Sequence, residues 1–147
     1  KIFFGLAGAM IPAGMKQIIL DMLDDIDVFV TTGANLTHDL IEALGENHYK
    51  GDEYADDKEL NKKGIDRIYD FYMKNEVYET LEDFFKENFD KLKDCENISK
   101  FLWKIGEILS VSPPSSQPSS VINKSSYSFA KSLAHPKKQR QKKVLCS

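Results

Sequence analysis

Two glycine-containing segments hold most of the groups in this chain that could bind a ligand. The first covers residues 5–14 and contains Gly5, Gly8 and Gly14, which allow close approach of the backbone and unusual dihedral angles. If a helix begins after these glycines, its first amides can bind a phosphate. The spacing is not that of the GxGxxG dinucleotide motif, so tight packing of a helix on a strand explains the same glycines equally well.

The second segment, residues 31–35, reads Thr-Thr-Gly-Ala-Asn. Its two hydroxyls, one glycine and one amide suit contacts with a ribose and a phosphate, although Thr and Asn are also common turn residues. His38 and Asp39 follow closely. His38 could carry a proton or bind a ligand, or it could be structural. An acid such as Asp39 is favoured near a helix N-terminus by the helix dipole alone.

Other kinds of chemistry have little support in the sequence. The chain has no Ser-His-Asp or Cys-His arrangement, no metal-binding motif and no Walker loop. His48 lies in a predicted loop with no visible partner, and Cys95 and Cys146 are isolated, which is typical of a reducing, cytoplasmic location. We see no signal peptide and no apolar run of membrane-spanning length. Because Lys1 already precedes a strand-like pattern, we expect an N-terminal portion to be missing.

The elements that would position these segments are strands followed by helices. Residues 2–4 and 26–30 are short apolar runs that predict buried strands. A helix is expected to begin at Pro12, and a second one is expected from an N-cap at Thr37 to a C-cap at Gly45. Two such units in tandem predict the front of a doubly wound parallel α/β sheet, in which ligands bind at the carboxyl ends of the strands.

The remaining residues up to 109 predict a short helix, an extended segment and two amphipathic helices. The short helix is expected near residues 56–63 and the extended segment over residues 65–72. Apolar side chains recur at helical spacing over residues 77–92 and again over residues 98–109. We interpret these two stripes as core or subunit interface rather than as a cofactor site.

After Ser110 the character of the sequence changes abruptly. Residues 1–110 contain 13 basic and 23 acidic residues, whereas residues 111–147 contain seven basic residues and no acid. The tail is rich in Ser and Pro, so we place a domain boundary after residue 109 and expect residues 110–147 to be disordered or to result from a frameshift. Its basic run could bind nucleic acid, act as a nuclear import signal or have no function. The acidic first part opposes binding to nucleic acid, so we do not expect that partner.

Several motifs in this chain, taken in order, resemble the deoxyhypusine synthase family, most closely its archaeal and bacterial branch. The motifs are Phe3-Phe-Gly-Leu-Ala-Gly-Ala-Met-Ile-Pro-Ala-Gly14, Asp27-Val-Phe-Val-Thr-Thr-Gly-Ala-Asn-Leu-Thr-His-Asp-Leu-Ile41, Gly64-Ile-Asp-Arg-Ile-Tyr69, Lys74-Asn-Glu-Val-Tyr78 and Phe101-Leu-Trp-Lys-Ile-Gly106. The resemblance covers residues 1–109. It implies a Rossmann-like fold and a tetramer with sites between subunits. It also implies an NAD-dependent transferase that moves the aminobutyl group of spermidine, through an imine and an enzyme lysine, to a lysine of translation initiation factor 5A.

Carried over position by position, the resemblance predicts which residues contact NAD and the polyamine. The expected NAD contacts are Gly8, Ala9, Met10, Ile11, Pro12, Thr32, Gly33, Ala34 and His38. The expected polyamine contacts are Thr37, His38 and Asp39. In eukaryotic members two consecutive glutamates stand where this chain has Thr37 and His38. This departure leaves open a related activity of the homospermidine synthase type.

The second departure from the family pattern lies after Leu109. The family continues there with the half of the sheet that supplies the catalytic lysine, and residues 110–147 do not resemble it. We therefore assign no catalytic residue and expect this chain to be an inactive fragment on its own. The alternative is a non-catalytic truncated subunit that binds NAD or full-length homologues.

Overall fold

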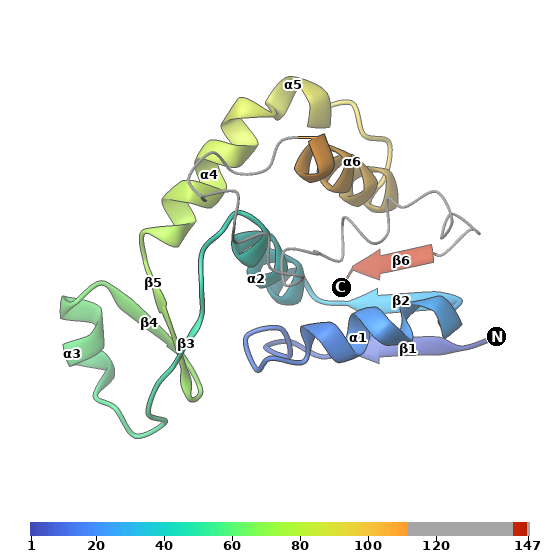
Figure 1. Ribbon diagram of the computed structural model, residues 1–147. Coiled ribbons are helices and arrows are strands. Elements are labelled where there is room, and N and C mark those ends of the chain that lie inside the picture. The colour runs from blue at the N-terminus through green and yellow to red at the C-terminus, as the bar shows by residue number, and fades with distance from the viewer. Residues whose placement is uncertain (112–142, 147) are drawn as a thin grey trace.

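The computed structural model describes residues 1–111 and 143–146, and it begins with a parallel sheet (Figure 1). The sheet has the strand order β1 (Phe3–Leu6), β2 (Val28–Thr31), β6 (Lys143–Cys146). Helix α1 (Lys16–Met22) and the short 3₁₀ helix η1 (Leu23–Asp25) connect β1 to β2. This is the strand–helix–strand unit that the sequence predicts, and it brings the ends of β1 and β2 side by side.

The first core lies where α1 and α6 (Ile98–Val111) meet the parallel sheet. Phe29 on β2 is 1% exposed, and its ring stacks on Phe4 of β1 with centroids 5.9 Å apart. The other buried members are Leu6, Ile11, Ile19, Leu23, Ile26 and Leu102. Burial of this many large apolar side chains stabilises the sheet against its helices.

A second core joins four helices beyond the sheet (Figure 1). They are α2 (Gly33–Ala43), α4 (Val77–Glu87), α5 (Phe89–Leu92) and α6. The buried side chains are Leu40, Ala43, Phe84, Leu92, Ile105, Ile108 and Leu109. The predicted stripe over residues 77–92 is thus part of the core, but the helix breaks at Asn88, whose side-chain amide donates to the carbonyl of Phe84.

A small antiparallel sheet lies beside the main body, on the far side of α2 from the parallel sheet (Figure 1). Its order is β3 (Tyr49–Lys50), β5 (Phe71–Lys74), β4 (Ile65–Ile68), and α3 (Asp57–Lys62) precedes β4. The predicted short helix and extended segment are confirmed, and the latter is a hairpin. A third buried cluster of Ile41, Met73 and Val77 ties this sheet to α2 and α4.

The structure corrects two predicted helix starts. The helix expected at Pro12 begins only at Lys16, because Gly14 adopts φ +80°, which a helix cannot include. The helix expected from Thr37 begins at Gly33, and its N-cap is Thr32, whose hydroxyl accepts a hydrogen bond from the Asn35 amide at 3.4 Å. The predicted end at Gly45 is confirmed, since this residue follows the C-cap with φ +99°.

The α/β class is confirmed, and the described residues form one parallel and one antiparallel sheet of three strands each. A complete doubly wound sheet remains an expectation. The predicted disorder of residues 110–147 falls largely on residues 112–142 and 147, which lie outside the described residues. The absence of any element in the tail was a wrong expectation for Lys143–Cys146, because these residues supply the backbone partners for the second edge of β2. Among the described residues, no helix is long and apolar enough to cross a membrane.

Candidate functional site

The two glycine-containing segments meet at the carboxyl ends of β1 and β2. Leu6 and Thr31 are paired in register at the last position of the two strands. Beyond them the chain passes close to itself, because a Cβ atom added at Gly8 would lie 3.6 Å from Oγ1 of Thr32. The predicted convergence of the two turns is therefore what the structure shows.

Asn35 holds this convergence in place. Its side chain is completely buried, and its Oδ1 accepts hydrogen bonds from the amides of Met10 at 3.1 Å and Ile11 at 3.3 Å. Its Nδ2 donates to the carbonyls of Leu6 and Ala7. The sequence analysis interpreted this amide as a group that could contact a ligand. In the structure its hydrogen bonds instead hold the first turn against α2.

The residues predicted to contact NAD divide into an exposed and a buried set. Gly8, Gly33 and Ala34 are exposed at the mouth formed by the two turns. Ile11 is only 1% exposed and belongs to the first core, and Pro12 is also buried. Ala9, Met10 and Thr32 lie between these extremes. Ala9 has φ +66°, a conformation that costs about 1 kcal/mol or more for a residue with a side chain and is often found at functional sites.

Behind the mouth, Lys16 links two carboxylates of α2. Its Nζ lies 3.0 Å from Oδ1 of Asp39 and 3.1 Å from Oε2 of Glu42. The Lys16 side chain is 9% exposed and that of Asp39 is 3% exposed. Burial alone would lower the pKa of Lys16, but the two carboxylates more than offset it, so this pKa lies above its ordinary value. Asp39, predicted to contact the polyamine, is therefore already ion-paired within the chain.

The same network continues through Glu42 to two histidines. Oε1 of Glu42 lies 3.0 Å from Nδ1 of His48, and Nε2 of His48 lies 3.0 Å from Nδ1 of His38. Burial and the neighbouring His48 lower the pKa of His38 below its ordinary value. Burial would raise the pKa of Glu42, but the hydrogen bond from His48 and the charge of Lys16 bring it below its ordinary value.

His48 lies in a loop between α2 and β3, as predicted, but the expectation that it has no partner was wrong. The sequence interval between His38 and His48 spans the end of a helix and a turn, so no periodic pattern could have paired them. Lys16 and Glu42 were missed for a similar reason, since each occupies a helix position that a solvent-exposed charge would also fit. The sequence feature that could have indicated this network is the cluster of polar residues on α2 next to the second turn.

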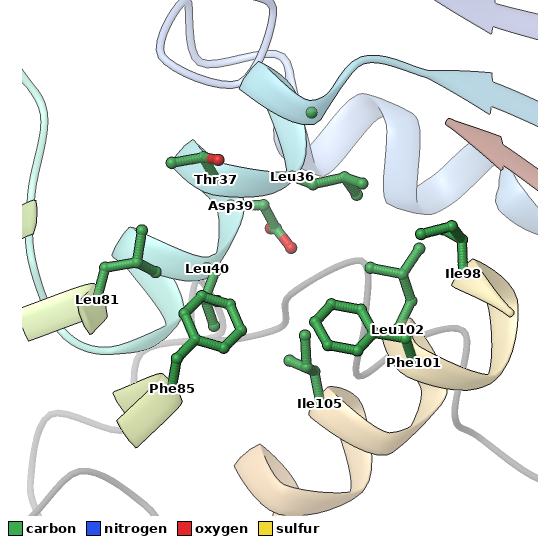
Figure 2. Close-up of a pocket in the computed structure, with 11 residues that line it drawn as sticks. Leu36, Thr37, Asp39, Leu40, Leu81, Phe85, Ile98, Phe101, Leu102 and Ile105 are labelled. Atoms are coloured by element: carbon green, nitrogen blue, oxygen red, sulfur yellow. The ribbon is translucent and has the colours of Figure 1, made fainter. Parts of the chain in front are cut away.

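A cavity of about 230 Å³ opens next to this network, between α2, α4 and α6 (Figure 2). Gly33, Thr37 and Asp39 line it, and the carboxylate of Asp39 points into it (Figure 2). The rest of the wall is apolar and consists of Leu36, Leu40, Leu81, Phe85, Ile98, Phe101, Leu102 and Ile105. His38 is not among the lining residues. The three residues predicted to contact a polyamine are thus split between the cavity and the histidine pair.

Comparison with known proteins gives one consistent family. The family model of deoxyhypusine synthase matches residues 1–129. "Probable deoxyhypusine synthase 1" of Methanosarcina mazei is 50% identical over 111 residues, which are 73% of this chain and 35% of the relative. The protein of the same name from Archaeoglobus fulgidus is 41% identical over 108 residues, which are 72% of this chain and 36% of the relative.

The chain therefore spans about a third of the length of the curated relatives that it matches. The family match runs past Leu109 to residue 129, so the domain boundary after residue 109 remains a prediction. The matched residues include both turns, all of α2 and the buried network behind them. On this evidence the chain belongs to the deoxyhypusine synthase family.

Proposed function

We propose that this chain contributes the cofactor- and polyamine-binding front part of an NAD-dependent transferase. In this reaction the aminobutyl group of spermidine is transferred to a lysine of translation initiation factor 5A. The observation that carries the proposal is the meeting of the two turns at the carboxyl ends of parallel strands. This is where α/β folds bind nucleotides, and the family membership supplies the reaction.

The mouth has features that fit the pyrophosphate of NAD. Gly33 and Ala34 begin an 11-residue helix, so their amides and the positive end of the helix dipole are available to an anion. Space around Gly33 is open, since a Cβ added there would meet no atom within 4 Å. Gly8 provides a second exposed, side-chain-free surface. When bound, NAD would supply the hydride acceptor, while the turns bind and orient it.

The apolar cavity fits the methylene chain of a polyamine better than its ammonium groups. Its wall is apolar apart from Thr37 and Asp39, and Asp39 is already paired with Lys16. We propose that the aliphatic part of spermidine lies along this wall and that the Asp39–Lys16 pair marks its polar end. The substrate, the acceptor protein and a tetrameric assembly in the cytoplasm are all parts of this proposal.

A homospermidine synthase type of activity is the second candidate. It is favoured by Thr37 and His38, which stand where the resemblance leads us to expect two anionic groups. The acceptor distinguishes the two reactions. A longer protein that includes this region would modify the factor 5A lysine in the first case and a free diamine in the second.

The cofactor proposal is tested by titrating NAD into the 147-residue chain in a calorimeter. We expect weak binding, and we expect Gly33→Asp to abolish it, because a carboxylate at the first helical position repels the pyrophosphate while suiting the helix dipole. Asn61→Asp adds the same charge to exposed α3 and is expected to leave binding unchanged. No heat of binding at millimolar NAD would contradict the proposal, as would equal affinities of the two variants.

The transferase proposal predicts that these 147 residues alone form no product from NAD, spermidine and precursor factor. The matched relatives are about twice as long as this chain, and the resemblance places the lysine that carries the aminobutyl group outside residues 1–109. Turnover by this chain alone would contradict the proposed division of the site. Co-purification with a full-length homologue, without turnover, would instead support the role of a non-catalytic subunit.

A further inference from the structure

We propose that His48 and Glu42 are positioning residues that hold His38 as its Nδ1–H tautomer and leave Nε2 of His38 as the proton-accepting atom. The inference concerns side chains to which the family resemblance assigns no role, apart from His38 itself. It rests on the proposed function only in naming the group that Nε2 would meet, an amine of the polyamine.

The order of the hydrogen bonds gives the direction. An ionised carboxylate can only accept, so Oε1 of Glu42, 3.0 Å from Nδ1 of His48, requires a proton on that nitrogen. In a neutral imidazole the other nitrogen then carries only a lone pair. Nε2 of His48 must therefore accept a hydrogen bond from Nδ1–H of His38, since these two nitrogens lie 3.0 Å apart. A neutral His38 with its proton on Nδ1 has an unprotonated Nε2.

The surroundings favour this arrangement over its reverse. Lys16 neutralises part of the charge on Glu42 through the 3.1 Å contact and holds its second oxygen, so the carboxylate is fixed in both position and ionisation. The His48 side chain is 4% exposed, so water has little access to compete for its nitrogens. Within the described part of the chain, Nε2 of His38 has no hydrogen-bond partner of its own.

The hydrogen bonds from His38 to His48 and from His48 to Glu42 also allow a proton accepted by His38 to move on. When Nε2 of His38 takes a proton from an ammonium group, the proton on its Nδ1 can pass to Nε2 of His48. The resulting imidazolium of His48 then faces the carboxylate of Glu42 at 3.0 Å, which stabilises the charge. One proton enters and one is displaced within the pair, so His38 returns to a neutral ring. The groups that set this balance are Lys16, Asp39, Glu42 and the two histidines.

Long-range ¹H–¹⁵N correlation spectra of the imidazoles in the 147-residue chain test the inference, since they distinguish the two neutral tautomers. The chain contains three histidines, and His38→Gln identifies the signals of His38. At pH 8 we expect His38 as the Nδ1–H tautomer. His48→Leu removes the acceptor and is expected to return His38 to the Nε2–H tautomer that free histidine prefers. His48→Gln keeps an acceptor oxygen and is expected to rescue the Nδ1–H form.

Two further variants make the test specific. Glu42→Gln removes the carboxylate that orients His48, and we expect a mixture of His38 tautomers. Glu59→Gln removes an exposed carboxylate on α3 that pairs with Lys62 and is expected to leave the spectrum of His38 unchanged. An Nε2–H tautomer of His38 in the unmodified chain would overturn the inference even if a variant fails to fold, and so would an unchanged spectrum in folded His48→Leu. Failure to bind NAD would contradict the proposed function and leave this result intact.

Discussion

At the scale of single residues, Asn35 decides the shape of both turns. Asn35→Asp keeps an acceptor for the amides of Met10 and Ile11, but it places a carboxylate against the carbonyls of Leu6 and Ala7, which then lose their donor. Because these groups are buried, we expect a loss of about 3 kcal/mol in the free energy of unfolding. Urea denaturation followed by circular dichroism measures it.

The matched control is Asn61→Asp, the same chemical change at an exposed position of α3. We expect it to alter the free energy of unfolding by less than about 0.5 kcal/mol. If Asn35→Asp were equally mild, the side chain of Asn35 would not be the fastener between the first turn and α2. The identity of Asn35 in the sequence could not reveal this role, because an amide after a turn also suits a ligand.

The buried side chain of His38 predicts that the chain loses stability on acidification. The pKa of His38 is lowered in the folded state from its ordinary value of 6.5, so below that pH the unfolded chain binds more protons and stability falls. The pKa of Glu42 is lowered from 4.5, so its contribution is present above that value and is lost as the pH falls further. The raised pKa of Lys16 contributes stability that is fully present below pH 10.5 and is lost only as the pH rises above that value.

Urea midpoints between pH 8 and pH 4 check these signs. His38→Gln cannot titrate but keeps a donor for His48, so we expect this variant to lose the part of the pH dependence that begins as the pH falls below 6.5. The further decline below pH 4.5, to which Glu42 contributes, should persist. Superimposable pH profiles of the two proteins would show that His38 keeps the same pKa on unfolding.

At the scale of elements, α6 stabilises both cores, and its two faces should differ sharply. Ile105 is 3% exposed and lies in the second core, whereas Ile98 on the same helix is 51% exposed. We expect Ile105→Ala to cost about 3 kcal/mol, from lost burial and an enlarged cavity. Ile98→Ala should cost less than about 1 kcal/mol. Both values come from urea denaturation, and equal losses would argue against the packing of α6 described above.

Periodicity predicted the elements well where it reports burial, and less well where local geometry decides. The stripe containing Leu102, Ile105 and Leu109 predicted α6 because one face of a helix must be apolar to pack. The N-cap of α2 was placed five residues too late, since Thr32 and Thr37 are equally good caps by residue type and only the extended backbone at Thr32 distinguishes them. The break at Asn88 was missed because the apolar stripe continues through it.

The long-range contacts of the site could not be predicted from the sequence, for a different reason. The convergence of the two turns follows from the topology of parallel strands, so it could be predicted. The path from Lys16 through Glu42 and His48 to His38 depends on how α1 packs against α2 and where the chain leaves α2. No local pattern encodes that packing, and each of these side chains, taken singly, also fits a solvent-exposed position.

At the scale of the whole molecule, the parallel sheet depends on pairing between the two ends of the chain. β2 is the central strand, with β1 on one side and β6 on the other. Deleting residues 143–147 would leave the second edge of β2 without its backbone partners over Val28–Thr31. An exposed edge of this kind invites pairing with another molecule, so a change at one end of the chain should affect both stability and association.

We expect this deletion to lower the free energy of unfolding by about 2 kcal/mol, from a few backbone hydrogen bonds, and to promote aggregation. Removal of Ser147 alone is the control, because it retains the four paired residues of β6. Urea denaturation gives the stability, and light scattering against concentration gives the association. If the deletion changed neither quantity, β2 would not need β6, and its second edge would be open to a different strand of the same sheet. That outcome would favour a longer doubly wound sheet, in which the position of β6 is taken by residues that follow in the relatives.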